Sequence, residues 1–133
     1  MPRYLLDTDI CSYVIRNRPP RARERMDAVP LEEQAMSVVT YAELLYGVKR
    51  SSSARVNRQV VDAFVRHLTV VPWDSAAAEH YGDLRAILEK RGTPIGAMDL
   101  MIAAHARSLG AIMVTHNRRH FEKVPGLNVE SWA

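Results

Sequence analysis

Three acidic residues and one amide occupy positions in this 133-residue sequence from which they could share a divalent cation. Asp7, Glu43 and Asn117 each follow a short apolar run, whereas Asp99 opens a segment with helical spacing. Carboxylate and amide oxygens are hard ligands, which favour Mg²⁺ or Mn²⁺ over softer metals. The residue types therefore predict a metal centre, provided that the fold brings the four side chains to one place.

The elements that must position them alternate between short apolar runs and longer segments with helical periodicity. Four runs are rich in β-branched residues, and they lie at 4–6, 36–39, 69–71 and 111–114, with a fifth short strand expected at 127–129. Such alternation is typical of βα units and predicts an α/β fold with a mostly parallel sheet. Ligands bind at the carboxyl ends of parallel strands, so three of the four polar residues should meet at one sheet edge.

Three helices are expected to face the core. Their apolar stripes are Val56, Val60, Val61, Phe64 and Leu68; Tyr81, Leu84, Ile87 and Leu88; and, within 98–109, Leu100, Ile102, Ala103, Ala106 and Leu109. Residues at this spacing share one side of a helix. Asp99 then falls in a first helical turn, from which its carboxylate can point toward the edge of the sheet.

Each acid also has a purely structural interpretation. Asp7 or Asp9 could cap a helix that begins near residue 10. Thr40 and Glu43 have the spacing of a capping box, in which the glutamate folds back onto the cap residue. Asp99 in a first turn would complement the helix dipole. These alternatives stay open residue by residue, and only the joint placement favours a site.

Composition limits the class of protein. Hydrophobic residues make up 47% and charged residues 25% of the chain, as in an ordinary globular domain, so residues 1–133 are expected to form a single domain. No apolar run approaches the roughly 20 residues that a membrane span needs, and no signal peptide is evident, which predicts a cytoplasmic protein. The net charge of +3 and a cluster of arginines at 16–25 are compatible with a polyanionic partner.

The order of the motifs resembles the PIN-domain toxins called VapC over nearly the whole chain. The resemblance is carried by Leu5-Leu6-Asp7-Thr8-Asp9, Thr40-Tyr41-Ala42-Glu43-Leu44-Leu45-Tyr46-Gly47, Gly92-Thr93-Pro94-Ile95-Gly96, Asp99, Ile102-Ala103-Ala104-His105-Ala106 and Val114-Thr115-His116-Asn117. Residues 92–96 and the ending Glu130-Ser131-Trp132 are similar to members that cleave initiator tRNA in its anticodon loop. The resemblance implies a three-layer α/β/α PIN-like domain, Mg²⁺ or Mn²⁺ dependence and endoribonuclease activity.

The same resemblance implies roles for individual residues. Asp7 and Asp99 would be the main metal ligands, Glu43 would position or deprotonate the attacking water, and Asn117 would assist through a water on the cation. Many members carry Asn where this chain has Asp9, and Asp where it has Asn117. Thr8 and Thr115 are expected to orient the carboxylates through hydrogen bonds. His116, a lone histidine in the motif, is interpreted as a solvated or structural residue.

The family also implies a VapB antitoxin as partner. Such an inhibitor could insert a basic side chain among the three acids, and an amphipathic helix of it could dock near Tyr13, Val14, Leu44, Leu45 and Val48, unless these residues are core. A homodimer is expected as the commonest symmetric state.

Two other classes of protein compete with the nuclease. The start Leu5-Leu6-Asp7-Thr8-Asp9 also fits a haloacid-dehalogenase-type phosphatase with Asp7 as covalent nucleophile. That family needs a second pair of acids after a later strand, which Asp83 within a helical segment does not supply. The other competitor is a non-enzymatic partner-binding domain whose acids are only caps.

Overall fold

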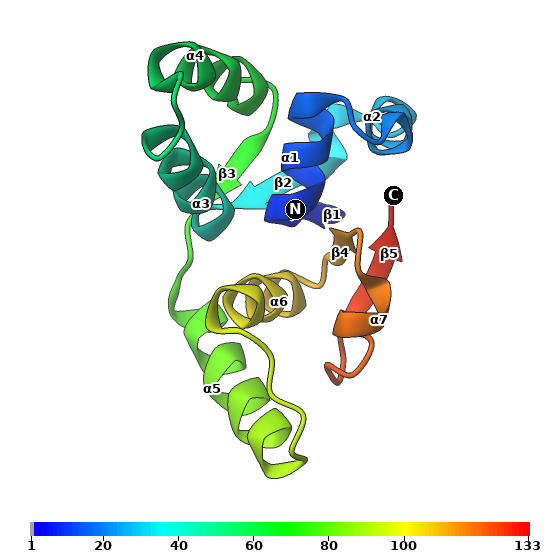
Figure 1. Cartoon of the computed structure of the whole chain (residues 1–133). Helices are drawn as coiled ribbons and strands as arrows, with labels where there is room; N and C mark the ends of the chain where they lie inside the picture. The colour runs from blue at the N-terminus through cyan, green and yellow to red at the C-terminus, as the bar shows by residue number, and fades with distance from the viewer. Residues whose placement is uncertain (1) are drawn as a thin grey trace.

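The computed structural model describes residues 2–133, and a five-stranded sheet lies at its centre (Figure 1). The strands are β1 (Tyr4–Leu6), β2 (Gln34–Ser37), β3 (Thr69–Val71), β4 (Ile112–Thr115) and β5 (Asn128–Ser131). Their order is β3-β2-β1-β4-β5, and each neighbouring pair is parallel. The predicted α/β class with a parallel sheet is confirmed.

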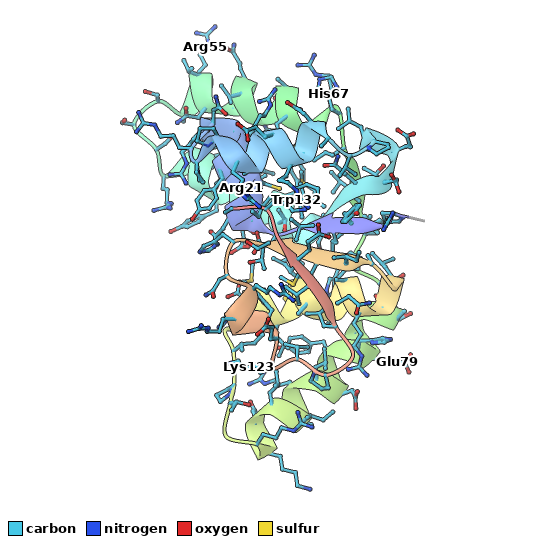
Figure 2. The ribbon with its side chains drawn as sticks, turned by 90° about the vertical axis from the view of Figure 1, so that its right-hand side faces the viewer. Arg21, Arg55, His67, Glu79, Lys123 and Trp132 are labelled. Atoms are coloured by element: carbon cyan, nitrogen blue, oxygen red, sulfur yellow. The ribbon has the colours of Figure 1, made fainter. Side chains whose placement is uncertain are left out.

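Helices cover both faces of this sheet. They are α1 (Thr8–Arg16), α2 (Pro20–Asp27), α3 (Val38–Lys49), α4 (Ala54–Val65), α5 (Ser75–Lys90), α6 (Ala97–Leu109) and the short α7 (Arg118–Phe121), with a 3₁₀ turn η1 at Leu31–Glu33. Figure 2 shows the sheet in the middle, α4 with Arg55 on the outer surface of one side, and α5 with Glu79 on that of the other. The architecture is the expected three-layer α/β/α arrangement.

Side-chain alternation along the strands builds two cores. On β1, Tyr4 and Leu6 pack with Ile10 and Val14 of α1, whereas Leu5 packs on the opposite face with Ile102 of α6. Successive side chains of a strand point to opposite faces, so a strand covered on both sides must be apolar throughout. Leu5 and Leu6 are accordingly inaccessible to solvent. This double burial holds the carboxyl end of β1, and with it Asp7, in a fixed position.

The second strand ends earlier than predicted. Val38 and Val39 were expected in the strand at 36–39, but they form the first turn of α3. Ser37 ends β2 and caps α3, because its hydroxyl accepts a hydrogen bond from the Val39 N–H at 3.1 Å. The β-branched residues therefore favoured the wrong element, since the cap of a serine outweighs their weak preference for strands. Smaller differences concern Ala111 and Leu127, which lie just before β4 and β5.

The apolar stripe of α4 is only partly core. Val61 is buried and Phe64 half-buried, but Val56 and Val60 are 58% and 42% exposed, against the prediction that they face the core. The helix lies at the periphery of its layer, so one side of the stripe faces solvent.

The surface predicted to receive a partner helix is also mostly interior. Val14, Leu44 and Val48 belong to the core beneath α1 and α3, and Tyr13 and Leu45 are half-buried. Within residues 2–133, no helix combines the length and the apolar character that crossing a bilayer requires.

Candidate metal centre

Asp7 lies where the order of strands reverses. The chain leaves β1 toward β2 on one side, and β4 lies on the other side of β1. The Asp7 N–H donates to the Val114 carbonyl at 2.9 Å, which ties the end of β1 to that of β4 (Figure 1). In open α/β sheets, such a switch point leaves a crevice in which ligands bind.

The Asp7 carboxyl group is held rigidly and almost out of water. It is 4% exposed, and its Oδ1 accepts a hydrogen bond from the Ile10 N–H at 2.9 Å. Burial raises the pKa of Asp7 to about 6, with a smaller contribution from Asp9, although the Thr115 hydroxyl and the Ile10 N–H act in the opposite direction. Asp7 is therefore a helix cap, as one alternative proposed. The capping hydrogen bond engages only Oδ1, so the negative charge of the buried carboxylate is poorly compensated.

Asp9 and His116 complete a group of three metal-type ligands with Asp7. One ligand atom from each lies within 4.8 Å of the others, and His116 Nδ1 is 3.4 Å from Asp9 Oδ2. Two carboxylates and an imidazole are donors that Mg²⁺ or Mn²⁺ accepts, Mn²⁺ more readily where nitrogen takes part. A cation here would compensate the buried charge of Asp7, so the residues fit a metal centre.

Glu43 reaches this group through Thr8. The Thr8 hydroxyl donates a hydrogen bond to Glu43 Oε1, which confirms Thr8 as a partner of a carboxylate. The capping-box interpretation of Thr40 and Glu43 is wrong, because α3 begins at Val38 with Ser37 as its cap. Glu43 lies in the second turn of α3, and its side chain is free to face α1 rather than its own backbone.

Asp99 and Asn117 meet at a different residue. Asp99 Oδ2 lies 3.5 Å from His120 Nε2, and Asn117 Oδ1 accepts from the His120 N–H at 3.3 Å, which caps α7. Asp99 is in the first turn of α6, as expected. Among residues 2–133, the side chains of Asp99 and Asn117 contact His120 and form no hydrogen bond or ion pair with Asp7.

The structure thus adds two histidines to the residues selected from sequence. His116 was interpreted as solvated or structural, yet its ring pairs with Asp9 and lies edge-on to Tyr13 at 5.3 Å between ring centroids. His120 lies outside the motifs that carry the resemblance. Both histidines follow β4, which lies next to β1 in the sheet. Only this neighbourhood would have pointed to them, and the order of strands cannot be derived from the sequence alone.

A groove opens beside the acids. Its volume is about 670 Å³, and its lining includes Asp9, Glu43, Arg16, Tyr46 and Arg50. The basic segment at 16–25 therefore contributes one arginine to it. Other arginines of that segment are engaged elsewhere, since Arg25 pairs with Glu130 and Arg23 with Asp27.

Known proteins resemble this chain along its whole length. The PIN domain family matches residues 4–127. The tRNA(fMet)-specific endonuclease VapC of Shigella flexneri is 44% identical over 100% of both chains, and that of Salmonella typhimurium strain LT2 is 41% identical over 99% of both. The crystal structure of DNA-bound VapBC from Salmonella typhimurium contains a chain with 41% identity and a TM-score of 0.94 over 100% of both chains.

These likenesses discriminate among the three classes considered from the sequence. They agree with the nuclease and support neither the phosphatase nor the non-enzymatic domain.

Proposed function

This chain belongs to the PIN-domain family and to its VapC branch, and from that premise we propose that it is a metal-dependent endoribonuclease, the toxin of a VapBC pair. One observation supports the chemistry above all others. A buried, poorly compensated aspartate, Asp7, lies at the switch point of a parallel sheet with Asp9 and His116 around it. We take residues 1–133 as a single PIN domain, in keeping with one continuous sheet from β1 to β5.

The substrate we propose is tRNA, and initiator tRNA in its anticodon loop in particular. The proposal rests on 44% identity to a protein named as a tRNA(fMet)-specific endonuclease. Basic surface residues would hold the backbone of the stem, while unpaired loop bases reach the acids, which is the usual division of labour on structured RNA. Its place of action is then the cytoplasm.

The cation we propose is Mg²⁺, with Mn²⁺ as a substitute. When bound, it polarises the scissile phosphate and promotes ionisation of water near neutral pH. Asp7 would hold the cation at the sheet edge with Asp9 and His116 beside it, and Asp99 would supply a further carboxylate from α6. Glu43, oriented by Thr8, positions the attacking water and accepts its proton. Asn117, whose Oδ1 accepts from the His120 backbone N–H at the N-terminus of α7, would assist through a water on the cation.

Cleavage mapping tests this proposal. Purified protein is incubated with total RNA and Mg²⁺ or Mn²⁺, and the cut ends are sequenced, with Asp7→Asn as the matched inactive control. We expect cuts concentrated at one position of a tRNA anticodon loop, which weaken as salt rises. Equal digestion of unstructured RNA would contradict the tRNA specificity, and no cleavage beyond that of the control would contradict the nuclease.

The partner we propose is a VapB-type antitoxin, which the VapBC assembly of the Salmonella relative supports. An apolar groove of about 400 Å³ between α1, α2 and α4 can receive an amphipathic helix of this partner, and Met26, Leu31, Val60 and Phe64 line it. Leu31 and Val60 are 43% and 42% exposed, so two large apolar side chains of this one groove are open to a partner. From this groove a following segment can reach the acids and insert an arginine, whose fork pairs with carboxylates.

Co-expression tests the partner. The small protein encoded beside this chain should restore growth and co-purify with it, and Leu31→Lys should weaken co-purification without lowering cleavage. A chain that is harmless at high expression and captures no such protein would contradict the toxin proposal. We also propose a homodimer, which light scattering of the free protein measures.

A further inference from the structure

The groove beside the acids combines three features that suit a flexible polyanion. It begins at Asp9 and Glu43, so it opens directly from the candidate metal centre. It runs between α1 and α3 toward α4, and its volume of about 670 Å³ is large enough for more than one nucleotide-sized group. Its chemistry changes along this path, from carboxylates at the metal end to arginines and an aromatic ring farther out.

Two positive charges on this path lack acidic partners. Arg16 at the end of α1 and Arg50 at the end of α3 both line the groove, and neither guanidinium forms an ion pair with another described residue. The guanidinium of Arg16 lies 5.6 Å from the ring centroid of Tyr13, and that of Arg50 lies 5.6 Å from that of Tyr46. An unpaired guanidinium held against a ring is available to phosphate oxygens.

Tyr46 supplies an open aromatic face. It is 68% exposed, the most of the large hydrophobic residues that stand out to solvent in the described chain. It follows Glu43 by three residues on α3, so both side chains lie on one side of the helix. Gly47 beside it also lines the groove, and a Cβ built there meets no atom within 4 Å. The space next to the ring is therefore open.

We propose that this groove is the binding subsite for a single-stranded segment of the RNA next to the cleaved phosphate, with one unpaired base stacked on Tyr46 and the flanking phosphates held by Arg50 and Arg16. The proposal rests on the proposed function and names the residues that recognise its substrate. Charge complementarity favours RNA as the occupant, because the two arginines without acidic partners match the phosphates of a polyanion. Stacking accepts any base, so this subsite selects unpaired structure rather than sequence.

Direct binding tests the stacking contact. A short fluorescein-labelled single-stranded RNA is titrated in EDTA, which prevents cleavage, and its anisotropy gives Kd for each variant. Tyr46→Ala should weaken binding by about tenfold, the loss of one stacked base, and Tyr46→Phe should keep it. Gly47→Leu should also weaken binding, because the leucine side chain would occupy the open space beside the ring. The variant should keep helix α3, because leucine favours a helix more than glycine does.

Salt dependence tests the phosphate contacts. Each phosphate contact to a single strand contributes about 0.7 to the slope of log Kd against log salt concentration, so Arg50→Ala and Arg16→Ala should each lower the slope by about that amount. Arg91→Ala removes the same charge at the end of α5, outside the groove, and should leave Kd and slope unchanged. Tyr46→Ala should change Kd and leave the slope unchanged.

The outcomes separate this proposal from the proposed function. If the wild type cleaves tRNA while Tyr46→Ala and Arg50→Ala bind RNA as the wild type does, the subsite is wrong and the nuclease stands. If binding depends on both residues but no RNA is cleaved, the subsite stands and the nuclease is wrong. A change in oligomeric state of Tyr46→Ala by light scattering, with RNA binding intact, would assign the groove to a second copy and overturn the proposal.

Discussion

The hydroxyl of Thr8 donates a hydrogen bond to a carboxylate oxygen of Glu43, so the residue next to Asp7 also orients the acid that comes from α3. This bond connects the carboxyl end of β1 to a helix that starts thirty residues later in the chain. The orientation of the Glu43 carboxylate therefore depends on a contact with α1.

Thr8→Val tests this dependence. Valine has the shape of threonine but no hydroxyl, so Glu43 loses its donor and should lose its orientation. Removing such a supporting bond typically lowers activity or metal affinity by about 10- to 100-fold. Thr8→Ser keeps the hydroxyl and should retain most of the cleavage rate. Initial rates on tRNA at saturating Mg²⁺ measure both variants, and equal rates for Val and Ser would show that the bond has no role.

Glu43→Gln separates a chemical role from a structural one. Glutamine keeps the length of the side chain and can still accept from Thr8, but it cannot take a proton from water. We expect cleavage to be lost while the thermal unfolding midpoint stays near that of the wild type, because the cap of α3 is Ser37. A large drop in the midpoint with cleavage retained would restore a structural role for Glu43.

Asp7→Asn and Asp99→Asn should abolish cleavage without unfolding the chain. At neutral pH the raised pKa of Asp7, about 6 against 3.8, means that its charge costs the metal-free fold roughly 3 kcal/mol. That cost decreases as pH falls from 6, where the carboxyl group of the folded chain protonates, to 3.8, where that of the unfolded chain does. In EDTA at pH 7, Asp7→Asn should therefore be at least as stable as the wild type to denaturant.

The metal response of the same variants gives an independent readout. Mg²⁺ or Mn²⁺ should raise the unfolding midpoint of the wild type, because a ligand bound only to the fold stabilises it, and should raise that of Asp7→Asn much less. Equal shifts for the two proteins would place the cation elsewhere.

His105 should make the fold sensitive to mild acid. Its ring is buried against Ser37, with Nδ1 at 2.8 Å from the serine hydroxyl, and burial lowers its pKa below 6.5. The neutral form is favoured in the fold, so its contribution is complete above pH 6.5 and is lost as pH falls from 6.5 through the folded pKa. Protonation of Asp7 below pH 6 raises the stability of the fold, which opposes the effect of His105. The contribution of His105 must therefore be measured as a difference between two proteins that both contain Asp7.

His105→Asn provides that difference. Asparagine does not titrate, so the free energy of unfolding of the wild type minus that of the variant should decrease between pH 7 and pH 5, while the Asp7 contribution cancels. Denaturant titrations at matched pH values measure it. A difference that is independent of pH would mean that His105 titrates alike in the folded and unfolded chain.

Local pattern was sufficient for much of this protein. The alternation of apolar runs and helical stripes predicted the parallel α/β sheet, and the position of Asp7 directly after a buried strand predicted its place at the sheet edge. These properties are readable because strand and helix periodicities, and the end of an apolar run, are encoded within a few consecutive residues. The resemblance to VapC predicted that Asp7, Glu43 and Asp99 belong to one site.

Tertiary structure decided which residues meet. β1 lies between β2 and β4, so Thr115 and His116 come beside Asp7 and Asp9 although more than a hundred residues separate them. Packing likewise left Val60 exposed on α4, and the end of β2 at Ser37 made this serine, rather than Thr40, the cap of α3. Sheet order and helix packing depend on the energy of the whole core, and no short window of sequence carries that information.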